Sequence, residues 1–222
     1  MPTLCSPAGG AFMQAGCPVR AEGAARLGSS CTDTRTSSDN GPSSGSAYVY
    51  RFDGATWTQE QKLLAADREA GDRFGTSVAV VEDIIVVGAY SVDEGVDDGG
   101  INFGSAYVFE FSGGLWTEEQ KLTASDGDAN DFFGTSVAID GGVIVVGADT
   151  EGENGFRSGA AYVYRRLDGL DWTENDKLTA SDGDNNDRFG HSVYVNGDVA
   201  VVGAYLDEND GSSQGSAYAF EL

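Results

Sequence analysis

The chain has 222 residues, enough for one or two domains of ordinary size. It carries 36 acidic against 13 basic side chains, which gives a formal net charge of −23. This charge excludes a basic nucleic-acid groove, because phosphate binding depends on Lys and Arg, and it disfavours adhesion to an anionic membrane surface. The sequence also has no apolar run long enough to insert into a membrane.

Residues 1–36 differ in composition from the rest of the chain. All four prolines, all three cysteines and both methionines lie before residue 44. The cysteines form no CxxC pair and have no histidine near them, so they do not indicate a zinc site. The N-terminus also lacks the basic-then-apolar pattern of a secretory signal. We expect 1–36 to be a disordered or non-native head that a protease would trim, leaving a core that begins near Ser37–Gly45.

Residues 37–222 repeat four short motifs in a fixed order, with first copies GSAYVY, WTQEQKL, FGTSVAV and VVGAY. The last three motifs recur after 59 and then 56 residues, so they move together as one unit. The copies begin at Gly45, Gly104, Gly159 and Gly215; at Trp57, Trp116 and Trp172; at Phe74, Phe133 and Phe189; and at Val86, Val145 and Val201.

Each motif is typical of a β-strand, because it is short, rich in β-branched and aromatic residues, and bounded by Gly, Asp or Asn. The segments VVEDIIVV, IDGGVIVV and VNGDVAVV predict tight hairpins. One unit therefore holds four strands in 56–59 residues, slightly more than the roughly 40–50 residues of other propeller blades. The sequence predicts an all-β fold, a partial β-propeller of four-stranded antiparallel blades with units beginning near Phe74, Phe133 and Phe189.

The glycines and aromatic residues of the motifs are expected to shape the junctions between blades. The glycine of each Phe-Gly pair allows a sharp turn into the strand nearest the axis. The phenylalanine before it is free to wedge between neighbouring blades, and the second glycine of each Val-Val-Gly-Ala motif suits close packing. The Trp motif starts the fourth, outermost strand. We expect all these aromatic side chains to serve packing and not ligand stacking.

These motifs resemble the FG-GAP repeat of integrin α-chain propellers, and more closely the bacterial FG-GAP repeat proteins. The resemblance covers residues 37–222. It implies an extracellular or cell-surface propeller used for binding or adhesion, with no chemistry of its own and no required cofactor. In integrins a calcium loop lies in the hairpin after the Phe-Gly strand. Here that hairpin is only VED, DGG or NGD, which is too short to wrap a cation, so that site does not carry over.

An acidic loop of the form D-x-[DE]-x-x-D precedes each Phe-Gly pair and is the candidate calcium site. Ca²⁺ needs six to eight oxygen ligands, and three carboxylates within six residues could supply about half of them. The order is not that of an EF-hand, because no glycine and no later bidentate Glu follow in the required places. The alternative is that Asp and Asn only shape the turn of a crossover. The copy at 67–72 is the poorest candidate because Arg68 and Arg73 offset its charge, which leaves as weak candidates Asp126, Asp128, Asp131, Asp182, Asp184 and Asp187.

A second acidic loop, of variable length, precedes the later GSAY motifs at 91–103, 149–158 and 206–214. Variable loops on a repeated scaffold commonly carry binding specificity. The leading hypothesis is therefore a non-catalytic module that binds a protein or glycan ligand at the cell surface.

Two other functions remain open: a glycosidase or lyase that uses acids of the variable loops, and a structural spacer without a specific ligand. The only histidine, His191, takes the place held by Thr76 and Thr135. Its neighbour Ser192 follows it on the same strand, so the two side chains point to opposite faces and cannot form a nucleophile–base pair. The sequence thus indicates no catalytic residue.

The strand count predicts an open arc of about three blades. From Gly45 onward there are two full blades, a last blade without its Trp strand, and two leading strands without partners. Three blades of sheet cannot close around an axis. We expect the two ends to lie apart and to expose apolar faces and strand edges that favour self-association.

Overall fold

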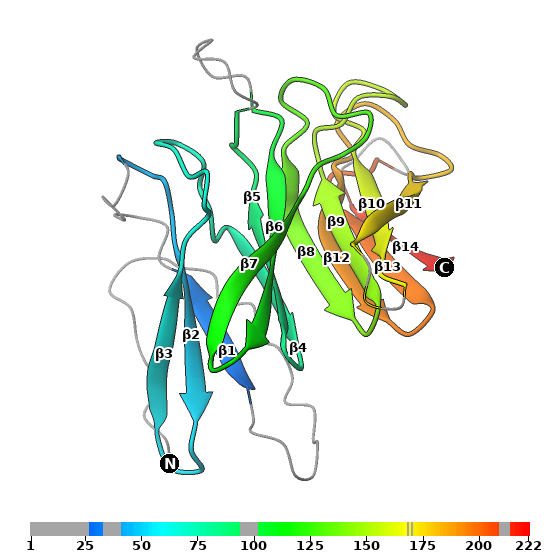
Figure 1. Ribbon diagram of the computed structural model, residues 1–222. Coiled ribbons are helices and arrows are strands. Elements are labelled where there is room, and N and C mark those ends of the chain that lie inside the picture. Colours follow the sequence, from blue (N-terminus) through cyan, green and yellow to red (C-terminus); the bar gives the residue numbers. More distant parts are fainter. Residues whose placement is uncertain (1–26, 33–40, 94–101, 168, 170, 209–213) are drawn as a thin grey trace.

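The structure is a computed structural model that describes residues 27–32, 41–93, 102–167, 169, 171–208 and 214–222. Its described strands form four antiparallel sheets, set side by side (Figure 1). The first sheet holds β1 (Leu27–Thr32), β2 (Ala47–Phe52) and β3 (Trp57–Leu63). The second holds β4 (Ser77–Val81), β5 (Ile84–Ala89), β6 (Ser105–Ser112) and β7 (Leu115–Leu122). The third holds β8 (Phe133–Asp140), β9 (Val143–Ala148), β10 (Ala160–Arg165) and β11 (Thr173–Leu178), and the fourth holds β12 (Phe189–Asn196), β13 (Val199–Ala204) and β14 (Ser216–Glu221).

The predicted fold class is confirmed. In each full sheet the strands follow one another in chain order, with the Phe-Gly strand at one edge and the Trp strand at the other. The three short hairpins have two-residue turns, closed by the pairs Val81–Ile84, Asp140–Val143 and Asn196–Val199. The first and last sheets lie at opposite ends of the row, so the sheets do not close into a ring (Figure 1). The described part of the chain contains no helix that is long and apolar enough to span a membrane.

Strand β1 lies inside the segment that we expected to fall outside the folded body. It pairs antiparallel with β2, on the side of β2 where the second and third sheets have their Val-Val-Gly-Ala strand. The leading strand β2 therefore has a second partner that the motif count did not predict. Residues 1–26 and 33–36 are not among the described residues, and the head boundary there stays a prediction.

Each junction between sheets is filled by the phenylalanine of a Phe-Gly pair. Phe74, Phe133 and Phe189 are fully or almost fully buried, and each belongs to a core cluster with members from the two sheets that it separates. Phe133, for example, packs with Val86 and Val108 of the second sheet and with Tyr162 of the third, whose ring centroid is 5.5 Å away. The expected wedge between blades is thus confirmed.

The glycine after each phenylalanine brings the two backbones into close contact. Gly134 adopts a positive φ of 91°, and its carbonyl oxygen accepts a hydrogen bond of 2.8 Å from the Ser77 hydroxyl of the preceding sheet. A Cβ atom on Gly88 would lie only 2.0 Å from that oxygen, so only glycine fits there. The next junction repeats this contact among Ser136, Gly147 and Gly190.

A second set of contacts joins the sheets at their outer edges. The side-chain amide of Gln61 donates to the Trp116 carbonyl at 2.7 Å and accepts from the Trp116 amide at 2.9 Å. Gln120 holds the backbone of Trp172 in the same way. Both tryptophans are buried, whereas Trp57 of the first sheet is 52% exposed. The expected packing of the Trp residues is therefore found at the two junctions where a preceding sheet supplies the glutamine.

Replacing Phe133 by Ala should lower the free energy of unfolding by about 3–5 kcal/mol, because it empties the junction between the second and third sheets. Urea unfolding followed by tryptophan fluorescence measures this loss. The matched control is Phe156→Ala, which removes the same side chain from an exposed position and should change stability by less than about 0.5 kcal/mol. Equal effects of the two substitutions would contradict the wedge.

Candidate functional site

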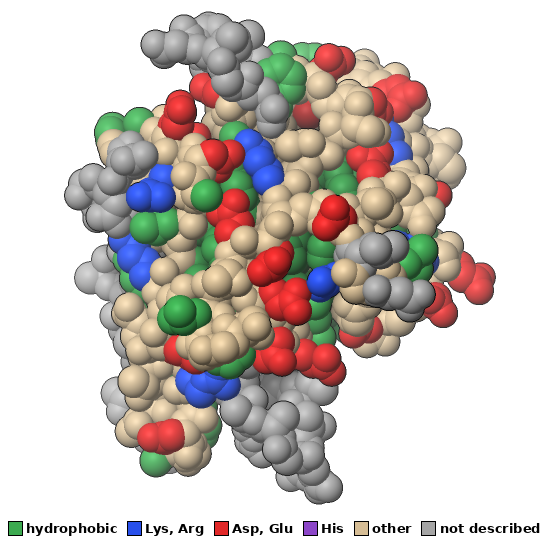
Figure 2. Space-filling view, viewed as in Figure 1, with side chains coloured by type: hydrophobic (Ala, Val, Ile, Leu, Met, Phe, Trp, Pro, Cys, Tyr) green, Lys and Arg blue, Asp and Glu red, His purple; other side chains and the backbone are tan. Residues whose placement is uncertain are grey.

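An acidic hollow of about 690 Å³ lies between the crossover loop 126–131 and the variable loop that begins the connection from β9 to β10. In Figure 2, acidic side chains are scattered over the visible face of the molecule, with fewer basic ones among them. The polar and aromatic side chains that line the hollow are Asp126, Asp128, Asn130, Asp131, Phe132, Thr150, Glu151, Glu153, Phe156, Arg157 and Lys177. Two loops that the sequence treated as separate candidates thus form one surface.

The first aspartate of the crossover loop ties the loop to the following sheet. Asp126 accepts hydrogen bonds from the Tyr162 hydroxyl at 2.9 Å and from Lys177 Nζ at 2.7 Å. Burial alone would raise its pKa, but these two partners outweigh burial and lower it. Asp67 binds Tyr107 and Lys121 in the same way, so the contact recurs at the preceding junction and is structural.

The last aspartate of the loop closes the turn. Asp131 is buried, and one carboxylate oxygen accepts the backbone amide of Asp128 at 2.7 Å. Asp72 and Asp187 make the same contact with the amide three residues before them. Burial raises the pKa of each of these carboxyls, and it raises that of Asp72 to about 6. These residues therefore act as the turn formers of the alternative interpretation.

The six predicted calcium ligands are thus divided between different roles. Asp126 and Asp182 bind tyrosines of the next sheet, and Asp131 and Asp187 close their own loops. Asp128 and Asp184 belong to the same two loops and have exposed side chains. Among the described residues, no three His, Cys, Asp or Glu side chains converge as a metal centre would require. Calcium binding stays a prediction.

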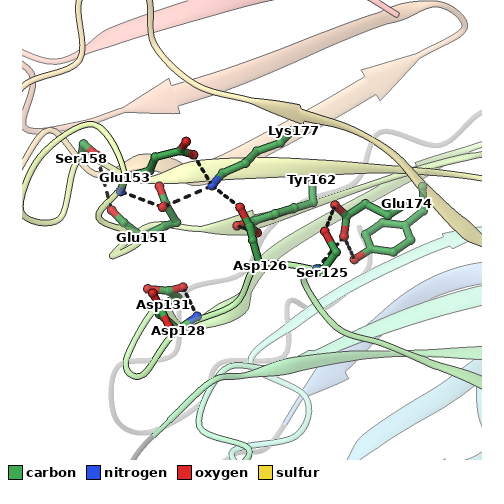
Figure 3. A network of polar contacts seen from close by, with 11 residues as sticks. Ser125, Asp126, Asp128, Asp131, Glu151, Glu153, Ser158, Tyr162, Glu174 and Lys177 are labelled. Carbon is green, nitrogen blue, oxygen red and sulfur yellow. Dashed lines mark hydrogen bonds and ion pairs between the residues drawn. The ribbon is translucent and has the colours of Figure 1, made fainter.

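Lys177 is the basic centre of the hollow (Figure 3). Its Nζ lies 2.7 Å from Asp126, 2.7 Å from Glu153 and 3.3 Å from Glu151. Desolvation alone would lower the pKa of Lys177, but hydrogen bonds to Asp126 and Glu153 and the charge of Glu151 raise it well above its usual value. In the sequence, Lys177 is only the lysine of the third Trp motif. Its role in the hollow could not be predicted, because Glu151 and Glu153 reach it from a loop whose shape no motif predicts.

Glu151 is a buried acid of the hollow at a position whose side chain differs from sheet to sheet. It is 6% exposed, and its Oε1 atom accepts from the Glu153 amide at 2.7 Å and from Lys177. Its Oε2 atom is buried without a hydrogen-bond partner. In the same place after Gly-Ala, the second sheet has the buried Val92 and the fourth has Asp207, which accepts a hydrogen bond from Tyr218. A buried carboxylate oxygen without a donor is costly to leave unpaired, so Glu151 carries a cost in stability that the apolar Val92 does not.

His191 lies on β12, the Phe-Gly strand of the fourth sheet. Its partner is Asp149 and not the neighbouring Ser192. Its Nδ1 atom is 3.0 Å from an Asp149 carboxylate oxygen, and its ring centroid is 4.3 Å from that of Tyr205. The Arg188 guanidinium is 3.8 Å from the same oxygen of Asp149. The histidine therefore belongs to a charged and aromatic contact that links β12 to the loop after β9.

Antiparallel sheets set side by side, with adjacent Phe-Gly strands and acidic loops at the crossovers, define a repeat protein of the β-propeller type. The chain belongs to the FG-GAP repeat family, which matches residues 57–109, 116–164 and 172–220. Each matched segment runs from the Trp strand of one sheet to the third strand of the next, so every sequence repeat connects two sheets covalently. Among curated proteins, none matches the chain.

The raised pKa of Asp72 predicts a pH-dependent stability. Its folded-state pKa of about 6 exceeds its ordinary value of 3.8, so ionisation opposes folding. The contribution of this group is most favourable below pH 3.8 and is lost as the pH rises through 6. Asp72→Asn keeps an oxygen that accepts the Glu69 amide and cannot ionise. The variant should be more stable than the parent by about 1–3 kcal/mol at pH 7, with the difference vanishing near pH 4. Urea unfolding at several pH values tests this, and a constant difference would contradict it.

Calcium binding predicts a rise in melting temperature only at millimolar Ca²⁺. Asp128 and Asp184 have the exposed carboxylates nearest to the middle of the two candidate loops. Replacing both by Asn should abolish the rise, because each substitution removes a carboxylate charge and so weakens an already weak Ca²⁺ site. Thermal unfolding at constant ionic strength, with Mg²⁺ as the control ion, measures the effect. No rise in the parent protein would leave only the turn-forming role.

Proposed function

We propose that this protein is a non-catalytic, extracellular or cell-surface binding module, and that the acidic hollow takes a basic side chain of a protein ligand. The observation that carries the proposal is the buried, unpaired Oε2 atom of Glu151 in a hollow lined by acids. A Lys or Arg side chain of a ligand would supply donors to the carboxylates of the hollow, and hydrogen bonds to a charged acceptor are among the stronger ones in proteins.

The charge of the hollow supports a cationic ligand. Five carboxylates line it, and the basic side chains among its lining are Lys177 and Arg157. Because Lys177 is already shared by Asp126, Glu151 and Glu153, an added positive charge enters a region that is negative on balance. The protein as a whole carries −23, which attracts cationic partners over longer distances.

The rim of the hollow supports a protein as the source of that cation. Phe156 is largely exposed beside the hollow, and the Arg157 guanidinium lies 4.8 Å from its ring centroid. Aromatic and arginine side chains are enriched where proteins bind one another. A volume of about 690 Å³ accommodates a long basic side chain together with parts of its neighbours.

Membership of the FG-GAP family supports the extracellular setting, since such repeats are typical of extracellular proteins. A binding role is also favoured by the way in which the acids are used. Asp126 and Asp131 serve the fold through hydrogen bonds that recur at other junctions. The part of the hollow that is specific to this junction is the loop with Glu151 and Glu153.

The proposal is tested with peptides of random sequence around a fixed central Arg, Lys or norleucine. The protein should enrich the Arg and Lys peptides. Glu151→Val, which installs the residue that the second sheet carries in that place, should weaken the selected peptides by about tenfold or more through the loss of a charge-assisted hydrogen bond. The matched control is Glu119→Gln, an exposed acid of β7 outside the hollow.

Preference for norleucine, or equal binding by Glu151→Val, would contradict a cation site at this hollow. Cleavage of glycan substrates by the protein, abolished by neutralising one acid of the hollow, would instead support the glycosidase or lyase alternative.

A further inference from the structure

A second hollow, of about 550 Å³, lies at the crossover from the first sheet to the second and differs from the acidic hollow in charge. We call it the arginine hollow. The two hollows are neighbours, since Phe132 lines both. No acid is found among the described residues that line the arginine hollow, although the chain contains 36 Asp and Glu side chains. Its polar and aromatic lining residues are Ser43, Arg73, Tyr90, Ser91, Asn102 and Phe132.

Arg73 is the basic group of this hollow, and no carboxylate pairs with it among the described residues. Its Nη1 atom donates to the Tyr90 hydroxyl at 2.6 Å, and its guanidinium carbon lies 5.4 Å from the centroid of that ring. In contrast, Arg51 and Arg166 reach glutamates at 2.9 and 3.0 Å. A guanidinium has five N–H donors in a fork that fits a carboxylate. Arg73 therefore has donors that an anionic ligand can use.

Two aromatic rings form the wall beside Arg73. Tyr90 and Phe132 are half-buried, and their ring centroids are 5.4 Å apart at an interplanar angle of 63°. Tyr90 follows β5 and Phe132 precedes β8, so the pair joins two successive crossovers. The face of an aromatic ring is negative and attracts the positive C–H edge of another group. The wall thus suits a ligand that presents C–H groups next to its charge.

The backbone around the hollow is held in place by hydrogen bonds. The Arg73 amide donates to the Ser43 carbonyl at 3.0 Å, and the Arg73 carbonyl accepts from the Thr76 hydroxyl at 2.7 Å. On the other side, the Ser91 amide donates to the Asp72 carbonyl at 3.3 Å. A preorganised site loses little conformational freedom when it binds a small ligand.

The size and charge of the hollow favour a small cyclic acid with hydroxyl groups. Sites for small molecules measure roughly 300–1,000 Å³, whereas a single Asp or Glu side chain would leave most of 550 Å³ unfilled. The lining residues Ser43, Ser91 and Tyr90 carry hydroxyl groups that match those of a sugar. Because the net charge of −23 repels polyanions, the ligand is expected to carry its acid among neutral groups.

We propose that the arginine hollow binds a carboxylated sugar residue, a uronic acid, of an otherwise neutral glycan. Arg73 pairs with the carboxylate, and the wall of Tyr90 and Phe132 contacts the C–H groups of the pyranose ring. This proposal goes beyond the cation site of the acidic hollow and does not rest on it.

The probe is methyl β-glucuronide, and methyl β-glucoside is its matched neutral sugar. Ligand-observed NMR titration of the full chain at constant ionic strength measures both dissociation constants. The glucuronide should bind at least about tenfold more tightly than the glucoside, because a charged pair of hydrogen bonds is stronger than a neutral one.

Two variants test the two halves of the site. Arg73→Gln should abolish the preference for the glucuronide and leave the affinity for the glucoside unchanged. Phe132→Leu should weaken both sugars by the same factor, roughly twofold to tenfold, because the ring contact does not depend on the carboxylate. The matched control is Arg165→Gln, a half-buried arginine of β10 outside both hollows, which should change neither affinity. Urea unfolding verifies that each variant is folded.

Three results would overturn the proposal. One is a glucuronide that binds no more tightly than the glucoside, and another is a preference that survives Arg73→Gln. The third is equal binding of N-acetylglutamate amide, because the ligand would then be an acidic protein side chain.

Glu151→Val separates this site from the acidic hollow. The variant should keep the preference for the glucuronide, whatever its effect on basic peptides. Loss of that preference would place the sugar in the acidic hollow and contradict the assignment to Arg73.

Discussion

The close approach of a glycine carbonyl to the neighbouring sheet is the contact on which the rest of the structure depends. At the second junction, the Gly134 carbonyl oxygen accepts a hydrogen bond from the Ser77 hydroxyl. The same oxygen would lie only 2.0 Å from a Cβ atom on Gly88. No other residue at position 88 allows that distance. The approach fixes the spacing of the sheets, and the adjacent Phe133 then fills the space between them. The glutamine contact to the Trp strand holds the outer edge of the same pair.

This constraint also separates the positions that can vary from those that cannot. The strand that ends in Val-Val-Gly-Ala is held by the glycine contact of the junction, whereas the third residue after Gly-Ala takes no part in that contact. That position holds Val92, Glu151 or Asp207, and all three are buried. A rigid framework thus presents one interchangeable buried side chain at each junction. A carboxylate there costs stability that the repeated contacts of the junction can offset.

The repeats allowed the strands, their order and the open arrangement of the sheets to be predicted, because motifs such as Phe-Gly and Val-Val-Gly-Ala reflect contacts made at every junction. The hollow could not be predicted in that way. Acids occur throughout the sequence, and which of them is buried depends on how a variable loop folds against Lys177 of a different strand. Strand β1 escaped prediction for a related reason, since LGSSCT shares no motif with the strand whose place it takes beside β2.

Departures from the repeat point to candidate binding residues more directly than the acidic loops do. The aspartates proposed as calcium ligands recur in every copy, and most of them turn out to make contacts that also recur, to Tyr162 and Lys177 or to their own loop. Glu151 does the opposite, because it stands where the second sheet has Val92, which packs in a core cluster. In a repeat protein, the equivalent positions of different repeats can be compared with one another. A residue that gives up a contact made by its counterparts is therefore the place to test for a ligand.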